Sequence, residues 1–105
     1  MLIYNVTIKV DNEIAGEWEH WMKTEHIPEV LSTGCFLENI FSKVTSIDEK
    51  DGTTYSAQYL CASPAVLERY FSDHAPQLRH AALAKYPDKF VAFRTVLEVL
   101  KRFNY

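Results

Sequence analysis

Apolar and polar residues alternate strictly at the start of the chain. One set of alternate positions from Leu2 to Val10 is entirely apolar, while the other set is mostly polar and holds Asn5, Thr7 and Lys9. A period of two with many β-branched residues is typical of a strand that buries one face. The pattern therefore predicts a β-strand over the whole of this segment.

The period changes to that of a helix directly after this strand. Asp11 and Asn12 offer side chains that can cap a helix N-terminus, and the apolar residues after them fall at i, i+4, i+7 and i+8. These residues are Ile14, Trp18, Trp21 and Met22. Their spacing predicts an amphipathic helix that turns one face to the core.

A proline sets the expected end of this helix. Pro28 disfavours helical backbone at Ile27, so we expect the helix to end near Glu25 or His26. A short turn or a one-turn helix is then expected over residues 28–33.

Two further β-like segments flank a charged turn. The first covers about residues 35–47 and carries large apolar residues on both sides, with Leu37 and Phe41 on the same side. The second, residues 53–61, alternates regularly. Residues 48–52 between them are charged and end in Asp-Gly, which is typical of a β-hairpin.

A second helical stretch and a last strand complete the pattern. Ser63 followed by Pro64 is typical of a helix start, and an apolar stripe continues to about Lys85. The stripe consists of Leu67, Tyr70, Phe71, Leu78, Ala81 and Ala82. Pro76 is expected to kink or split this helix. A strand is predicted over residues 90–100, which are apolar on both sides.

The order of these elements defines an α+β fold class. The chain of 105 residues suits one domain, residues 1–105, and has the order β-α-β-β-α-β. This split βαβ arrangement is the ferredoxin-like fold, a four-stranded antiparallel sheet with two helices on one face.

The other face of such a sheet has no helix to cover it. We expect a second copy of the chain to pack there as a homodimer, with Leu37 and Phe41 in the interface, because most soluble oligomers are symmetric homo-oligomers. The tail, residues 101–105, would add to the interface or fray. A monomer with a partly apolar sheet face is the alternative.

Composition narrows the classes of function. A formal net charge of −3 and a pI near 5.7 disfavour binding to nucleic acid, which needs a clustered basic surface. No basic leader precedes an apolar segment, and no run of about 18 apolar residues occurs. A soluble cytoplasmic protein without membrane contact is the expectation.

Neither the cysteines nor the histidines have the spacing of a metal site. Cys35 and Cys61 are far apart in the sequence. The four histidines form two pairs six residues apart, about 240° around a helix, so neither pair lies on one face. We expect no metal and no cofactor; for haem, His74 would be the one candidate axial ligand.

The run from Trp18 to Phe36, WEHWMKTEHIPEVLSTGCF, joined to the rest of the pattern, resembles the dimeric α/β-barrel superfamily. Within that superfamily the chain resembles a small family filed as a domain of unknown function, over essentially its whole length. The resemblance implies a ferredoxin-like dimer whose ligand lies between helices and sheet. The superfamily includes cofactor-free monooxygenases, haem-degrading enzymes, isomerases and proteins of no known activity, so fold alone assigns no function.

Two polar residues fall on the apolar stripes of the helices. At 100° per residue, Glu25 lies about 20° from Ile14, and His74 lies at about 340° from Leu67. With His26, they are the candidate catalytic residues. The candidate ligand-binding residues around them are Trp18, Trp21, Met22, Tyr70 and Phe71.

Two functions remain open for this site. The first is the binding of a small organic ligand between helices and sheet, which requires no catalytic group. The alternative is a cofactor-independent monooxygenase-like or isomerase-like enzyme that uses His74 or Glu25 as general base. Purely structural roles, such as a salt bridge for Glu25 and a satisfied buried His74, are favoured over a catalytic role for both residues.

Overall fold

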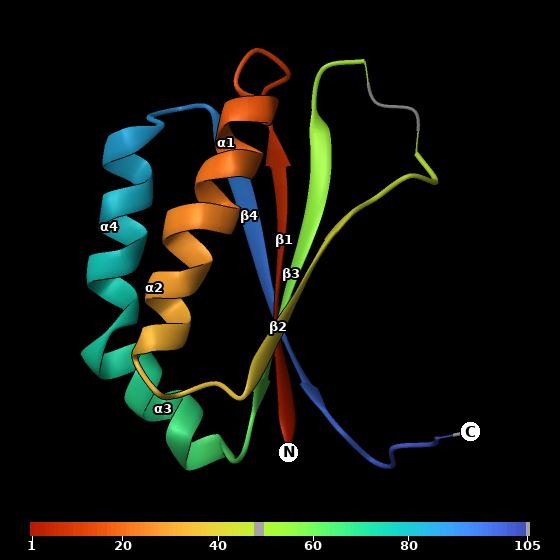
Figure 1. The fold of residues 1–105 in the computed structure, drawn as a ribbon, viewed down its shortest axis with the longest axis vertical. Coiled ribbons are helices and arrows are strands. Elements are labelled where there is room, and N and C mark those ends of the chain that lie inside the picture. Colours follow the sequence, from red (N-terminus) through yellow and green to blue (C-terminus); the bar gives the residue numbers. More distant parts are fainter. Residues whose placement is uncertain (48–49, 105) are drawn as a thin grey trace.

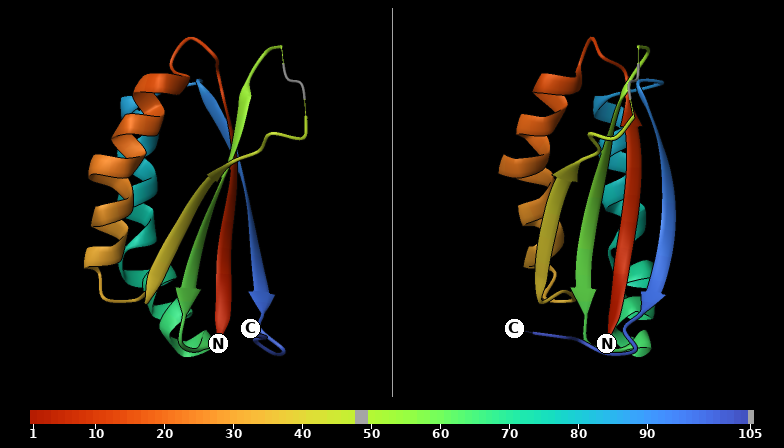
Figure 2. Two further views of the ribbon diagram at one scale, coloured as in Figure 1. Left: turned by 45° about the vertical axis from the view of Figure 1, so that its right-hand side comes forward. Right: turned by 90° about the vertical axis from the view of Figure 1, so that its right-hand side faces the viewer.

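Four antiparallel strands form one sheet in the order β2-β3-β1-β4 (Figure 2). The strands are β1 (Leu2–Val10), β2 (Glu38–Lys43), β3 (Thr53–Cys61) and β4 (Phe90–Glu98). The predicted ferredoxin-like fold is confirmed, because each βαβ unit places a third strand between the two strands that it connects.

The structure, a computed structural model, describes residues 1–47 and 50–104. Part of the predicted hairpin turn, residues 48 and 49, lies outside the described residues. β2 and β3 pair antiparallel on either side of it, and Val44 N–H donates to the Thr54 carbonyl at 2.8 Å beyond the end of β2. The predicted hairpin is therefore confirmed, although β2 is shorter than the expected strand over 35–47.

All helices lie on one face of this sheet (Figure 1). The first helical segment runs through α1 (Ala15–Trp21), the π-helical turn η1 (Met22–His26) and α2 (Ile27–Ser32). The second helical segment consists of α3 (Pro64–Asp73) and α4 (Ala75–Lys85). On the opposite face of the sheet, which we call the open face, none of the described residues forms a helix (Figure 2).

The first helix does not end before Pro28, and that prediction is wrong. The backbone continues through η1, where Ile27 N–H donates to the carbonyl of Met22, five residues back, and α2 follows directly. Pro28 then lies in the first turn of α2, a position in which proline is common. The π turn thus accommodates the proline without breaking the helix.

The two helix starts differ in how they are capped. Ser63 caps α3 as predicted, since its hydroxyl oxygen accepts a hydrogen bond from Val66 N–H at 3.4 Å. The predicted caps of the first helix are wrong: α1 follows Ile14, which offers no capping side chain. Asp11 instead accepts from Glu13 N–H at 2.9 Å, so its carboxylate closes the preceding turn.

The second helix splits where Pro76 indicates. His74 separates α3 from α4 with φ −128°, and Pro76 lies in the first turn of α4. The expected split is confirmed, and its cause is the clash of a proline ring with the preceding helical turn.

Phe41 lies on the covered face of the sheet, and its expected place on the open face is wrong. It pairs with the fully buried Ala57 of β3, and its ring stacks on Tyr55 at 5.5 Å and packs against Trp18 at 5.9 Å between ring centroids. The register of β2 against β3 decides this side. Leu37, just before β2, is 62% exposed, and its place in an interface stays a prediction.

Aromatic side chains fill the core between β1, β3 and the helices. Tyr4 in the central strand lies at their centre, with its ring 5.3–6.0 Å from four others. These are Phe36, Tyr59, Tyr70 and Phe71. Offset and edge-to-face contacts at such distances add to the stability that burial provides.

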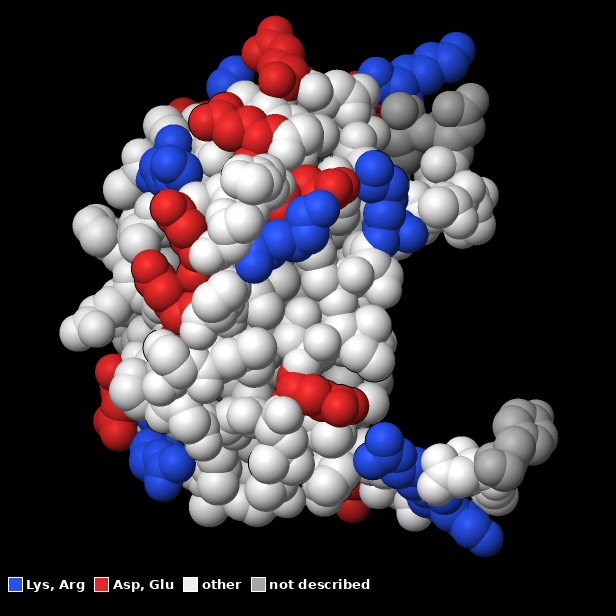
Figure 3. Space-filling model, in the orientation of Figure 1, with Lys and Arg blue, Asp and Glu red and all other residues white. Residues whose placement is uncertain are grey.

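The open face carries apolar side chains mainly on β4. Val91 and Phe93 are 56% and 70% exposed there. Leu97 lies on the same face of β4, two residues beyond Thr95. At the right of Figure 3 this face is hollowed and carries few charged side chains between its two ends. Within the described residues, no helix is long and apolar enough to cross a membrane.

Candidate functional site

A cavity of about 260 Å³ lies between the helices and the sheet. Its walls come from α1, η1, α2, α3 and α4 on one side and from β1, β3 and β4 on the other. Most of the walls are apolar: Val6, Ile8, Val30, Ala57, Leu78, Ala82, Phe90 and Ala92. The volume is just below the ~300 Å³ at the small end of known ligand pockets, so only a small molecule fits.

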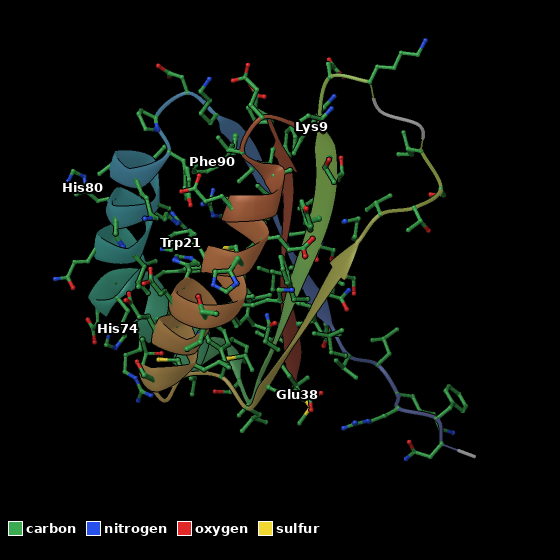
Figure 4. The ribbon with its side chains drawn as sticks, turned by 45° about the horizontal axis from the view of Figure 1, so that its top comes forward. Lys9, Trp21, Glu38, His74, His80 and Phe90 are labelled. Carbon is green, nitrogen blue, oxygen red and sulfur yellow. The ribbon has the colours of Figure 1, made fainter. Side chains whose placement is uncertain are left out.

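Four of the five predicted ligand-binding residues line this cavity. They are Trp18, Trp21, Met22 and Tyr70. In Figure 4, Trp21 lies in the space between α1 and α4, and Phe90 lies near it where β4 begins. Phe71 is not a lining residue; its ring lies behind the wall, against Tyr4.

The structure separates the three candidate catalytic residues. Glu25 is exposed, so its expected place on the buried stripe is wrong. His74 lies at the junction of α3 and α4 (Figure 4), with its ring 6.3 Å from Tyr70, and does not line the cavity. His26 does line it. A catalytic role for any of the three stays a prediction.

The π turn explains why His26, and not Glu25, faces inward. Residues five apart differ by about 140° around an α-helix, so Trp21 and His26 would point in different directions there. In η1 the hydrogen bonds span five residues, and the two rings stack with centroids 4.8 Å apart. The π turn inserts one extra residue into the helix, so every later side chain points where its neighbour would in a regular α-helix. The angles calculated from the sequence assumed 100° per residue and did not include this shift.

The cavity keeps this imidazole neutral. Burial lowers the pKa of His26 to about 4, because the charged form loses water that no polar group replaces. Among the lining residues there is no carboxylate that could stabilise an imidazolium. At neutral pH, His26 therefore offers one hydrogen-bond donor and one acceptor nitrogen to a ligand.

Sequence reasoning did not find the two arginines of the site. Arg79 of α4 and Arg94 of β4 both line the cavity. The sequence pattern could have identified Arg94, because it lies on the same side of β4 as Phe90 and Ala92. For Arg79 there was no such signal: the predicted apolar stripe runs through Leu78, Ala81 and Ala82, but in the structure Ala81 is exposed and α4 has no single apolar face.

Buried phenols complete the polar lining. The Tyr4 hydroxyl accepts a hydrogen bond from Nη2 of Arg79 at 3.3 Å. Burial raises the pKa of Tyr70 to about 12 and lifts the pKa of Tyr59 well above its ordinary value. These hydroxyls stay protonated at neutral pH and can donate to an acceptor on a ligand.

The described part of the chain contains no group of three or more His, Cys, Asp or Glu side chains placed to hold a metal ion. Cys35 and Cys61 are both buried and unpaired with each other.

Comparison of sequences assigns the family. Residues 1–100 match the model of DUF4286, a domain of unknown function, and the chain belongs to this family. The resemblance to a family of this kind within the ferredoxin-like superfamily is confirmed. No curated protein sequence matches the chain.

Solved structures with little sequence similarity share the fold. MhuD, with two manganese protoporphyrin IX molecules per active site, matches with a TM-score of 0.73 at 16% identity over 100% of both chains. SnoaB, a cofactor-independent oxygenase from Streptomyces nogalater, matches at 0.69 and 10% identity, covering 99% of this chain and 98% of its own. A dimeric ferredoxin-like protein from an uncultured marine organism matches at 0.63 and 17% identity over 100% of both chains. At such identities these matches establish the fold alone.

Proposed function

We propose that this protein binds a small organic molecule in the cavity between its helices and sheet. The observation that carries the proposal is the cavity itself, which has apolar walls, aromatic side chains and a few inward polar groups. That composition is typical of small-molecule sites.

The π turn supports this proposal independently. Such turns occur frequently at functional sites, because a proline or an extra residue re-aims side chains at some cost to helix regularity. Here η1 directs His26 into the cavity and stacks it on Trp21.

The neutral fluorophore N-phenyl-1-naphthylamine tests the proposal. Its emission rises in apolar surroundings, and we expect saturable binding to the wild-type protein. Ala82→Trp, which fills the cavity from α4, should abolish this binding, whereas Ala84→Trp, on the same helix outside the lining, should preserve it. Equal binding to both variants would place the fluorophore elsewhere and refute the proposed site. Circular dichroism of each variant checks that it is folded.

An enzyme is the second candidate, and His26 is the observation that favours it. The sequence suggested His74 or Glu25 as general base, but His26 lines the cavity and carries an unprotonated nitrogen at neutral pH. It could take a proton from an acidic C–H of a bound ketone and leave an enolate, the first step of an isomerase or a cofactor-independent oxygenase. Its lowered pKa makes it a weak base, so this candidate ranks second.

Deuterium exchange separates the two candidates. In D2O, a general base at His26 would speed exchange of the α-protons of 2-tetralone, as the imidazole takes the proton and returns a deuteron. His26→Gln should remove the acceleration and His80→Gln, on the outer side of α4 (Figure 4), should not. No acceleration by the wild type, with binding intact, leaves binding as the function.

We also propose that the protein works as a homodimer through the open face. The exposed side chains of Val91, Phe93 and Leu97 support this, because an apolar patch of this kind on a small domain commonly marks a protein contact. The marine ferredoxin-like protein of the same fold is described as dimeric. A second copy would bury the same patch twice around a two-fold axis.

Light scattering coupled to gel filtration measures this directly. We expect the wild type to have the mass of a dimer and Phe93→Glu the mass of a monomer, because a carboxylate in the apolar patch opposes burial. Ala84→Glu on the helical side introduces the same charge and should leave the dimer intact. A wild-type mass of one chain at micromolar concentration would refute the dimer.

A further inference from the structure

The exposure of the lining residues shows where the cavity opens. Buried residues such as Met22 and Ala57 form its floor, while the exposed members of the lining are Arg79, Leu83 and Arg94. These three belong to α4 and β4. The opening therefore lies between that helix and that edge strand, and two of its three exposed residues are arginines.

Arg79 and Arg94 both lie beside the same part of β1. Arg79 reaches across from α4 and donates to the Tyr4 hydroxyl, and its guanidinium lies 5.8 Å from the centre of the Phe71 ring. Arg94 pairs with Val6 in the register of β4 against β1. Val6 is the next residue after Tyr4 on the helix-facing side of β1. A helix and a strand thus bring two positive charges to the opening of the cavity from its two opposing walls.

Electrostatics at Tyr70 agree with this geometry. Burial raises the pKa of its phenol, and the charges of Arg79 and Arg94 both act against that rise. Both cations are therefore close enough to influence the same buried hydroxyl.

Among the residues that the structure describes, no carboxylate pairs with these two charges. Within residues 1–47 and 50–104, the ion pairs involve lysines, and neither Arg79 nor Arg94 forms one. The lining residues include no Asp or Glu. Two cations beside an apolar cavity and without a counter-ion repel each other, and an anion between them relieves that repulsion.

We propose that the cavity takes an apolar organic acid, whose carboxylate is bound by Arg79 and Arg94 at the opening while its ring or chain lies against Trp21 and Met22. This inference rests on the proposed binding function and names the chemical class of the ligand. Guanidinium groups suit this role, because their planar fork of donors matches a carboxylate and they are weakly hydrated. The protonated Tyr70 hydroxyl adds a donor nearby.

Two competitors that differ only in charge test the class of ligand. 1-Naphthoate and 1-naphthamide share ring and shape, and each is used to displace N-phenyl-1-naphthylamine from the protein. We expect naphthoate to displace it at roughly tenfold lower concentration, since hydrogen bonds to charged groups are stronger than neutral ones. Added salt should weaken naphthoate binding and leave naphthamide unchanged.

Arginine variants then assign the preference to residues. Arg79→Gln and Arg94→Gln should each reduce the preference for naphthoate, and the double variant should abolish it while N-phenyl-1-naphthylamine still binds. Arg69→Gln, an exposed arginine of α3 outside the lining, is the matched control and should retain the preference.

Each outcome separates this inference from the function on which it rests. Equal displacement by acid and amide would overturn the inference and leave the binding site in place. A preference for naphthoate that survives the double variant would overturn the assignment to these arginines. Failure of the fluorophore to bind, or binding that Ala82→Trp does not affect, would overturn the proposed function and the inference with it.

Discussion

The two strands that flank β1 have the same length and opposite surroundings. β3 and β4 each pair with β1 over nine register positions. The residues of β3 that face the helices, from Tyr55 to Cys61, are at most 3% exposed. On β4 the helix-facing Val96 is 49% exposed, and Arg94 beside it is exposed too.

This difference follows from where the helices lie. The buried faces of β1 and β3 lie under the helices, whereas β4 is an edge strand and contributes Phe90, Ala92 and Arg94 to the wall of the cavity. β3 thus holds the core together, whereas β4 provides one wall of a cavity and an apolar open face. The edge strand of the sheet carries the candidate functions, and the inner strand carries the stability.

Replacing one aromatic residue on each strand tests this division most strongly. Tyr59→Ala on β3 removes a ring that packs on Tyr4 and Phe36, and should lower the free energy of unfolding by about 3–5 kcal/mol. Phe93→Ala on the open face of β4 should cost below about 1 kcal/mol at concentrations where the chain is monomeric. Urea denaturation gives both values; equal losses would contradict the division.

Two neighbouring residues of β2, the other edge strand, test whether its helix-facing side contributes to stability as that of β3 does. Phe41→Glu places a charge among Trp18 and Tyr55 and should destabilise the protein by about 3 kcal/mol. Ile40→Glu, one position away and 57% exposed, should change unfolding little. The same denaturation series measures both, and a larger loss for Ile40→Glu would mean that the faces of β2 are assigned wrongly.

The stability of the folded protein should decrease in acid because of His26, which lies in the helical wall of the cavity. The pKa of His26 is about 4 in the folded protein and 6.5 in the unfolded chain. Below pH 6.5 the unfolded chain binds a proton that the native state does not, so stability falls from pH 6.5 down to pH 4 and this contribution is then constant. The loss is at most about 3.5 kcal/mol, at ~1.4 kcal/mol per pKa unit.

Urea denaturation at several pH values between 4 and 7 measures this slope. His26→Gln should flatten it, because the titrating imidazole is gone, while His80→Gln on the outer side of α4 should retain it. A slope that persists in His26→Gln would assign the acid sensitivity to other groups.

Local patterns in the sequence determined the order of elements and most of the core. The alternation in residues 2–10 and 53–61 placed two strands correctly, and Ser63 with Pro64 located the start of α3. Four of five ligand-binding candidates line the cavity for the same reason, since apolar periodicity identifies the face of a helix that is buried.

Only the tertiary structure decided the polar part of the site and the side of β2 to which Phe41 belongs. One extra residue in η1 moved His26 inward and left Glu25 outside, and no periodicity of single residues records such a shift. Strand register reversed the expected side of Phe41, because a slip by one residue exchanges the faces of a strand. Arg79 and Arg94 line the same cavity because the fold places α4 and β4 on its two walls, which depends on contacts between segments distant in the chain.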